Sequence, residues 1–166
     1  MIFKKILIIV ICTVFSLNAF ANTPRSTGKY KNWESFTVET DKGKICFAQT
    51  IPTKRAPAAI KRNKSKLFVT FRPSENIKDE ISITSGHDYK TSTVTASSGK
   101  RRYSFFSQKN FAWLLDDQEE RKFIQLMKKA TDIIVKARTT KGAETTDHYS
   151  MMGFTKAYNT AKKTCS

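Results

Sequence analysis

Two groups of basic residues carry the side chains best suited to chemistry with a ligand. The first group lies between residues 54 and 66, where there is no acidic residue and where Pro52 and Pro57 favour an irregular loop. The second group follows the turn at 97–100. We predict anion binding by Lys54, Arg55, Lys61, Arg62, Lys64, Lys66, Lys100, Arg101 and Arg102. Lysine attracts anions as a point charge, and arginine makes bidentate bonds to phosphate or carboxylate. A solvated basic loop without a ligand is the alternative.

The charge of the whole chain agrees with an anionic partner. The formal net charge is +16, and removal of an N-terminal leader with Lys4 and Lys5 lowers it to +14. Such a field attracts polyanions and anionic membrane surfaces. Nucleic acid is an unfavoured partner, because we expect most aromatic residues in the core and because an exported protein does not meet cellular nucleic acid. The pair Phe105-Phe106 would point one ring to each face of its strand.

The sequence contains no arrangement typical of catalysis. His87 and His148 each have an aspartate as neighbour, Asp88 and Asp147, but adjacent residues on a strand point to opposite faces. No Gly-x-Ser-x-Gly motif and no metal-ligand spacing occur. The acidic residues at 116–120 fit the start of a helix better than a glycosidase pair. We therefore expect a protein without enzymatic activity, cofactor or metal.

Residues 1–21 have the pattern of a secretory signal peptide. Lys4 and Lys5 precede an apolar stretch at 6–17, and Ala19-Phe20-Ala21 forms a small-x-small cleavage site. Cleavage near Ala21 would leave a periplasmic or secreted protein without a membrane-spanning segment; an uncleaved N-terminal anchor is the alternative. Two cysteines, Cys46 and Cys165, would remain, and an even count in an exported chain predicts one disulfide rather than two free thiols.

The elements that must position these residues are mostly strands. Residues 22–31 are polar, which predicts a flexible lead-in, and residues 32–166 form one domain. Runs of aromatic and β-branched residues predict strands over 33–40, 45–50, 66–71, 80–84, 92–96, 102–107, 111–115, 131–139 and 143–151. Helical spacing predicts a helix over 116–130 with Asp116 as N-cap, and a closing helix over 155–163. The fold class predicted is mainly β, a sandwich with two short helices.

Three segments resemble the invasion-associated locus B family of secreted alphaproteobacterial proteins. They are Lys31-Asn32-Trp33, the run from Gly43 to Gln49, and the run from Tyr149 to Tyr158 that leads to Cys165. The resemblance implies an immunoglobulin-like β-sandwich, the Cys46–Cys165 bridge, a periplasmic or surface location and, in some pathogens, a link to host-cell entry. It transfers no catalytic residues. On this fold we expect Trp33 in the core, Thr155 as the cap of the last helix and Phe154 as its anchor.

The function expected from these features is that of an envelope protein which binds an anionic partner through the basic loop. An envelope glycan, a lipid headgroup and an acidic protein all fit that chemistry. Two alternatives remain open. The first is a periplasmic structural or chaperone-like protein that binds other chains by an exposed sheet edge. The second is a hydrolase of an envelope polymer, in which His87 or His148 would meet a carboxylate from another strand.

Overall fold

The computed structural model describes residues 22–166, so the predicted leader and its cleavage site lie outside the described residues. Within this described part of the chain, eleven antiparallel strands form one sheet, and two α-helices complete the fold. The predicted mainly-β fold class is therefore confirmed. The strands are β1 (Arg25–Tyr30), β2 (Trp33–Thr40), β3 (Gly43–Thr50), β4 (Lys54–Ala56), β5 (Lys66–Arg72), β6 (Ile77–Thr84), β7 (Val94–Ser98), β8 (Arg101–Gln108), β9 (Phe111–Trp113), β10 (Asp132–Arg138) and β11 (Glu144–Ser150).

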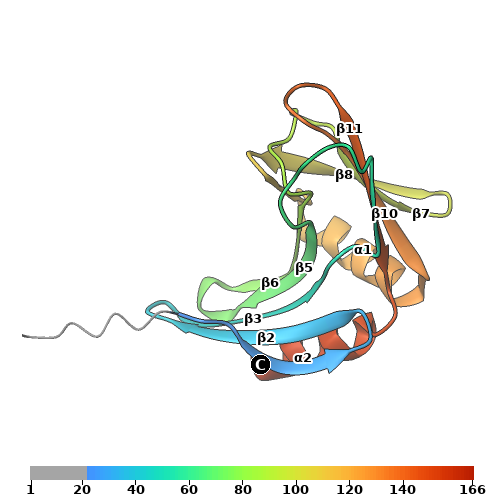
Figure 1. The fold of residues 1–166 in the computed structure, drawn as a ribbon. Helices are drawn as coiled ribbons and strands as arrows, with labels where there is room; N and C mark the ends of the chain where they lie inside the picture. Colours follow the sequence, from blue (N-terminus) through green and yellow to red (C-terminus); the bar gives the residue numbers. More distant parts are fainter. Residues whose placement is uncertain (1–21) are drawn as a thin grey trace, which may run out of the picture.

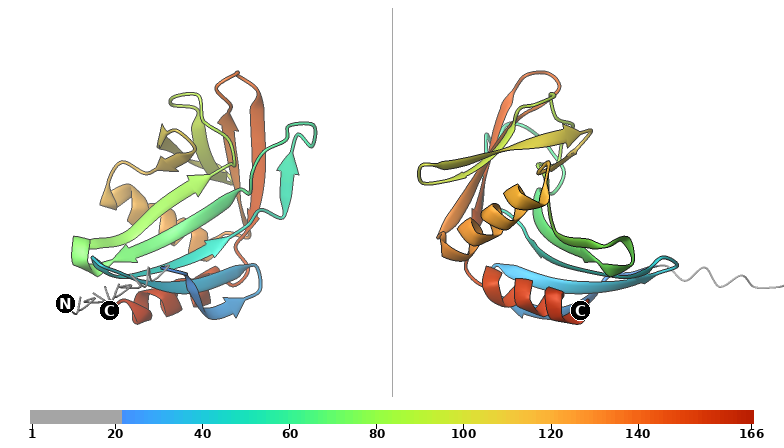
Figure 2. Two further views of the ribbon diagram at one scale, coloured as in Figure 1. Left: turned by 60° about the vertical axis from the view of Figure 1, so that its left-hand side comes forward. Right: turned by 180° about the vertical axis from the view of Figure 1, so that it is seen from behind.

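The sheet is continuous but divided into two halves by β8. The strand order is β1-β2-β3-β5-β6-β9-β8-β7-β10-β11-β4. The first part of β8, from Arg101 to Phe105, pairs with β7, and its last three residues pair with β9. The two halves meet at a steep angle, as Figures 1 and 2 show, and a single hydrophobic core lies between them and the helices.

The first helix, α1 (Asp117–Lys129), begins as predicted. The Asp116 side chain accepts a hydrogen bond of 2.8 Å from the backbone N–H of Glu119, which satisfies one of the free donors at the helix start. One face of α1 is buried, and the ring of Phe123 lies 5.0 Å from that of Tyr103 and 5.6 Å from that of Phe105, both on β8. The helix is thus anchored on the strand that joins the two halves of the sheet.

The second helix, α2 (Phe154–Thr164), packs on β1, β2 and β3. Phe154 is fully buried, as predicted, and its ring lies 4.8 Å from that of Trp33, which is also fully buried. The Trp33 indole N–H donates to the Ser150 carbonyl over 2.9 Å. A disulfide joins Cys46 of β3 to Cys165 after α2, again as predicted. The helix and the strands beneath it are therefore held by packing and by a covalent link.

The prediction that Thr155 caps α2 is wrong. Gly153 occupies the N-cap position with a φ of +94°, and no side chain makes a capping bond. A left-handed backbone favours glycine, and the Gly153 Cα lies against the backbone carbonyl of Tyr30, where a Cβ would not fit. Close approach between α2 and the end of β1 decides which residue starts this helix.

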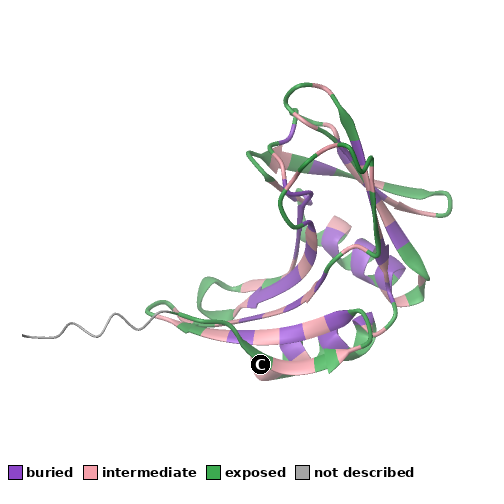
Figure 3. Ribbon diagram, viewed as in Figure 1, coloured by how far each residue is buried: buried purple, intermediate pink, exposed green. Residues whose placement is uncertain are grey.

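The predicted flexible lead-in at 22–31 also requires correction, because most of it forms β1. This strand pairs with β2 from Arg25↔Thr37 to Tyr30↔Trp33, with an irregularity between Ser26 and Gly28. Its polar residues suit an edge strand, one side of which faces water. Figure 3 shows the general pattern, in which buried residues alternate with half-buried and exposed residues along strands such as β2.

Candidate functional site

Arg62, in the middle of the predicted anion-binding loop, already has an internal carboxylate partner. Its guanidinium makes a bidentate ion pair with Asp147 of β11, with Nη2–Oδ1 and Nη1–Oδ2 distances of 2.6 and 2.7 Å. The side chains are 2% and 1% exposed. Nη1 also donates to the Ser85 carbonyl and to Ser65 Oγ. Arg62 is therefore not available to an external ligand, which corrects its assignment.

The remaining basic residues of the loop divide into two kinds. Arg55 donates to the Asn63 carbonyl over 2.5 Å, and its Nε lies 4.0 Å from Asp147 Oδ1, so it helps to hold the loop. The Lys66 amine donates to Gln49 Oε1 over 3.3 Å. Three lysines remain exposed to solvent, namely Lys54, Lys61 and Lys64. Part of the loop is regular, because residues 54–56 form the edge strand β4 on β11.

The second predicted group does not join the first in space. Arg101 and Arg102 are exposed but point to opposite faces of β8. Arg102 lies in a row of paired residues that crosses β7, β10 and β11 to Lys54. Four strand spacings separate the two ends of this row, roughly 19 Å. Arg101 instead borders a cleft of about 430 Å³ beside Arg121 and Lys122 of α1. Lys100 is exposed in the turn before β8.

A different cationic surface forms at the start of α2. We call it the lysine patch and define it as Lys29, Lys31, Ile51, Met152 and Lys156. Ile51 and Met152 are exposed by 59% and 56% although both are apolar. Two clefts, of about 310 and 540 Å³, share Lys29 and Lys31, and one contains Ile51 while the other contains Met152 and Lys156. The patch therefore places three cations around two apolar side chains, and the carboxylate of Glu34 lines one of its clefts.

Backbone contacts hold the segments of this patch together. The Asn32 N–H donates to the Met152 carbonyl over 3.2 Å, and the Asn32 carbonyl accepts from Thr50 Oγ1 over 2.7 Å. Asn32 thus fixes the turn that carries Lys31 between the segments that carry Ile51 and Met152. Sequence reasoning missed the patch because its residues come from three separate segments, and no local pattern connects them.

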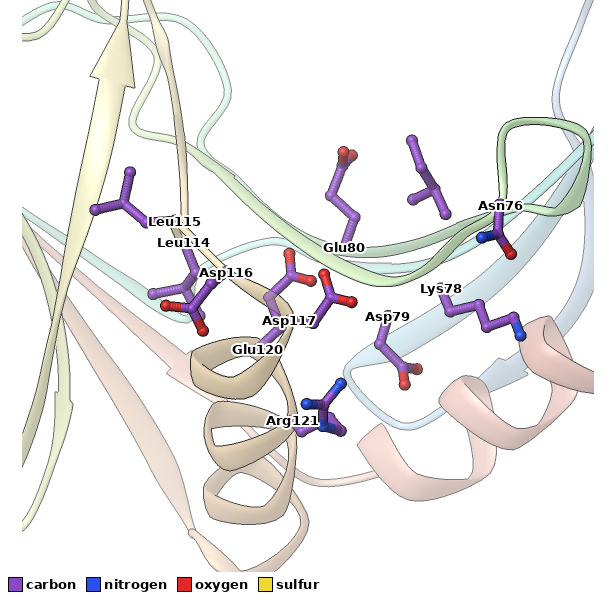
Figure 4. Close-up of a pocket in the computed structure, with 11 residues that line it drawn as sticks. Asn76, Lys78, Asp79, Glu80, Leu114, Leu115, Asp116, Asp117, Glu120 and Arg121 are labelled. Carbon is purple, nitrogen blue, oxygen red and sulfur yellow. The ribbon is translucent and has the colours of Figure 1, made fainter.

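Acidic side chains gather in one cleft of about 480 Å³ between β6 and the start of α1, drawn in Figure 4. The acidic residues that line it are Asp79, Glu80, Asp116, Asp117 and Glu120, of which Glu80 points to the other side of β6. Four of them have structural partners. Asp116 caps α1, Asp79 accepts from the Tyr158 hydroxyl over 2.7 Å, Glu80 makes a bidentate pair with Arg72, and Glu120 accepts from the backbone of Ile81. The helix-start interpretation of 116–120 thus holds for Asp116.

Glu120 is the unusual carboxyl group of this cleft. It is only 8% exposed, and its Oε1 accepts the backbone N–H of Ile81 over 3.1 Å. Burial raises the pKa of Glu120 to about 7, opposed by the Ile81 hydrogen bond and assisted by the nearby charges of Glu80, Asp117 and Asp79. Glu120 therefore takes up a proton near neutral pH, in contrast to an ordinary glutamate.

The two histidines lie on opposite sides of β11. His87 contacts Thr145 Oγ1 through Nε2 at 2.9 Å and the Asp88 carbonyl through Nδ1 at 3.0 Å. His148 lies on the outer face, opposite Ile134 and Lys54.

Among residues 22–166, no group of three or more potential ligands could hold a metal ion. In the same part of the chain, no helix is long and apolar enough to cross a membrane.

The aromatic residues are less buried than the sequence suggested. Phe71 and Phe105 belong to the core, and Phe106 is 52% exposed, so the prediction that Phe105 and Phe106 point to opposite faces is confirmed. The expectation of core packing is wrong for Phe68, Phe111 and Trp113, which are only half-buried.

Comparisons of the chain with protein-family models, curated proteins and solved structures found no match.

Proposed function

We propose that this chain is an exported, non-enzymatic protein that docks on an anionic, phosphate-bearing lipid surface of the cell envelope. The observation that carries the proposal is the lysine patch, in which cations surround the exposed side chains of Ile51 and Met152. Two contributions are usual in binding to a membrane interface. Apolar side chains enter the boundary between headgroups and acyl chains, and lysines neutralise the lipid phosphates.

The distribution of charge supports the same proposal. The chain has 30 basic and 14 acidic residues, and five of the acidic residues line the cleft of Figure 4. One carboxylate, Glu34, lines a cleft of the lysine patch beside Lys29 and Lys31, and the net charge of the chain is strongly positive. A long-range field of this kind steers a protein toward an anionic surface and orients it there.

Export is supported by two features of different kinds. The signal-peptide pattern of residues 1–21 is one, and the Cys46–Cys165 disulfide, typical of oxidising compartments, is the other. The resemblance to the invasion-associated locus B family points in the same direction. We include that family relationship, and a role in contact with a host, in the proposal.

Binding through a sheet edge is less favoured. The two edge strands are β1 and β4. β4 has three residues, two of them basic, and Pro57 follows it; β1 is irregular between Ser26 and Gly28. Short, charged and irregular edges discourage the addition of another strand. A hydrolase based on the histidines is less favoured too, because the contacts of His87 are a hydroxyl and a carbonyl.

Sedimentation with vesicles tests the proposal. The chain without residues 1–21 is mixed with vesicles of phosphatidylglycerol and phosphatidylcholine, or of phosphatidylcholine alone, over a range of salt concentrations. We expect binding only to the anionic vesicles, with affinity that falls as salt rises. Each lysine near such a surface contributes about 1 kcal/mol, so Lys29, Lys31 and Lys156 replaced together by Ser should weaken binding about 100-fold.

Two further variants locate the binding surface. A triple change of Lys54, Lys61 and Lys64 to Ser tests the loop while Arg62 stays in place. The matched control replaces Lys90, Lys109 and Lys141, three exposed lysines at the other end of the β10–β11 hairpin, with Ser. Equal losses in the patch variant and in this control would show that diffuse charge binds, and absence of binding by the parent would overturn the proposal altogether.

A further inference from the structure

One face of the sheet half formed by β1, β2, β3, β5, β6 and β9 carries a band of aromatic side chains. Both helices lie on the other face, as Figures 1 and 2 show, and among residues 22–166 no helix covers the aromatic side. We call this surface the aromatic face and define it by Phe36, Phe47, Phe68, Phe111 and Trp113, on β2, β3, β5 and β9. Each of these residues is half-buried and alternates along its strand with buried core residues.

The rings of the aromatic face form a continuous series. Centroid distances are 5.2 Å from Phe36 to Phe47, 6.2 Å from Phe47 to Phe68, 6.5 Å from Phe68 to Phe111 and 5.9 Å from Phe111 to Trp113. Phe106, which pairs with Trp113 across the strands and is 52% exposed, extends the series at one end. An apolar surface of this extent marks an interaction site on a soluble domain.

Polar groups accompany the rings in a groove of about 340 Å³. The groove is lined by Phe47, Phe68, Thr70, Arg72, Glu80, Ser82, Phe111 and Trp113. Arg72 donates to Glu80 over 3.1 and 2.8 Å and to Glu75 over 3.2 Å, so its charge is balanced by carboxylates. The groove therefore combines apolar rings with hydrogen-bonding groups, and the charge of Arg72 within it is balanced. The Lys66 amine lies at its edge, 5.7 Å from the centroid of the Phe68 ring, and donates to Gln49.

This combination identifies the chemistry of the occupant. A polyanion finds no unbalanced cation at Arg72, and an aliphatic chain would remove water from Arg72, Glu80 and Ser82 without replacing their hydrogen bonds. A sugar ring has an apolar C–H face that packs on an aromatic ring, and it has hydroxyl groups at its rim. A series of rings across several strands suits an extended chain of such units rather than one sugar.

We propose that the aromatic face binds a neutral glycan chain. Phe47, Phe68 and Trp113 stack with successive sugar rings, and Arg72, Glu80 and Ser82 make hydrogen bonds to their hydroxyl groups. This second binding activity lies on a different surface from the lysine patch and does not depend on it. A protein with both surfaces would hold an anionic lipid surface and a neutral polysaccharide at the same time.

Isothermal titration with maltoheptaose, cellohexaose and chitohexaose tests the proposal. We expect binding of at least one of these neutral probes with an affinity that does not change with salt. Tryptophan fluorescence should report the same event, because Trp113 is half-buried while Trp33 is fully buried. If none of the three glycans releases or absorbs heat on titration and none shifts the tryptophan emission, the proposal is overturned.

Variants place the binding on the aromatic face. An aromatic stacking contact contributes about 0.5–1.5 kcal/mol, so Phe68→Ser should weaken binding about 3- to 10-fold. Phe106→Ala, at a more exposed position, tests the face with less risk to folding, and Met152→Ser on the lysine patch is the control. Unchanged affinity in Phe68→Ser and Phe106→Ala, or equal loss in Met152→Ser, contradicts the proposal.

Sedimentation velocity of the parent separates this occupant from a second copy of the chain. A dimer that dissociates in Phe106→Ala would show that the face is a self-association surface and would overturn glycan binding. If lipid binding by the lysine patch is wrong, the vesicle assay shows it, because binding there depends on salt and on the lysine variants. If glycan binding by the aromatic face is wrong, the titrations with neutral glycans show it. The two proposals can therefore fail independently.

Discussion

Arg62 Nη2 lies 2.6 Å from Asp147 Oδ1, in an ion pair that is almost completely buried although the two residues are 85 positions apart. The pair joins the basic loop before β5 to the middle of β11. It satisfies a guanidinium that would otherwise be the best anion ligand of the loop. Arg62, predicted from the sequence to bind an anionic ligand, thus has a structural role instead. Its removal should lower the stability of the fold.

Loss of either partner of this pair should strongly destabilise the protein. Arg62→Ala leaves the Asp147 carboxylate buried without its partner, and Asp147→Ala does the same to the guanidinium. Breaking a buried pair in this way lowers the free energy of unfolding by about 3–5 kcal/mol. Urea denaturation followed by circular dichroism measures the loss.

Lys61→Ala is the matched control, since this neighbour of Arg62 is exposed. It should change the free energy of unfolding by less than about 0.5 kcal/mol. The double variant of Arg62 and Asp147 should lose less than the sum of the two single losses, because it removes both charges together. Strictly additive losses would contradict direct coupling between the two side chains.

The disulfide should contribute strongly to stability because it closes most of the domain. Cys46 and Cys165 are separated by 119 positions. In the chain-entropy description, a loop of this length corresponds to about 4–5 kcal/mol, and measured losses on removal are about 2–5 kcal/mol. Cys46→Ser combined with Cys165→Ser should therefore lower the Tm markedly. Reductant should lower the Tm of the parent toward that of the variant, and equal melting of all samples would contradict the prediction.

Local patterns were sufficient for the elements with one clear apolar face. The span 33–40 predicted from aromatic and β-branched residues is the span of β2, and Asp116 caps α1 as expected from its position. The sequence did not reveal β1, because its polar residues are stabilised as a strand by pairing with β2. Nor did it reveal the role of Gly153, which depends on contact with Tyr30.

The candidate sites show the same limit more clearly. In β5, Leu67, Val69 and Phe71 are buried, while Phe68 between them is half-buried. Alternation therefore indicates two faces, but only the arrangement of the helices decides which face is covered. Similarly, the charges of the loop at 54–66 are evident in the sequence, whereas the partner of Arg62 comes from β11 and could not be identified from local spacing.

Glu120 should make the stability of the protein depend on pH around neutrality. Its pKa of about 7 lies above the ordinary value of 4.5, because burial disfavours the charged form. A carboxyl whose folded-state pKa is raised stabilises the fold fully below the unfolded pKa, and this contribution is lost as pH rises through the folded pKa. The parent should therefore lose stability between pH 5 and pH 8, by roughly 1–3 kcal/mol.

Glu120→Gln isolates this group, because the amide oxygen can still accept the Ile81 N–H. The variant should be more stable than the parent at pH 8 and should lose that advantage toward pH 5. Urea denaturation at several pH values measures both curves. Asp117→Asn, in the same cleft, is the control for a general change in charge. Parallel curves for the parent and Glu120→Gln would show that another group titrates.

Gly153→Ala tests whether the approach of α2 to β1 requires glycine. The substitution would place a Cβ against the Tyr30 carbonyl, at a residue whose φ is +94°. Gly142 is the matched control, since its φ is +86° but nothing lies within 4 Å of the position of a Cβ. Gly142→Ala therefore carries only the backbone cost of about 1–2 kcal/mol, whereas Gly153→Ala should lose about 2–4 kcal/mol. Equal losses in urea denaturation would show that α2 can move away from Tyr30 freely. A larger loss at Gly153 would show that the backbone contact sets the position of α2, which carries Lys156 of the lysine patch and whose N-cap residue follows Met152 directly.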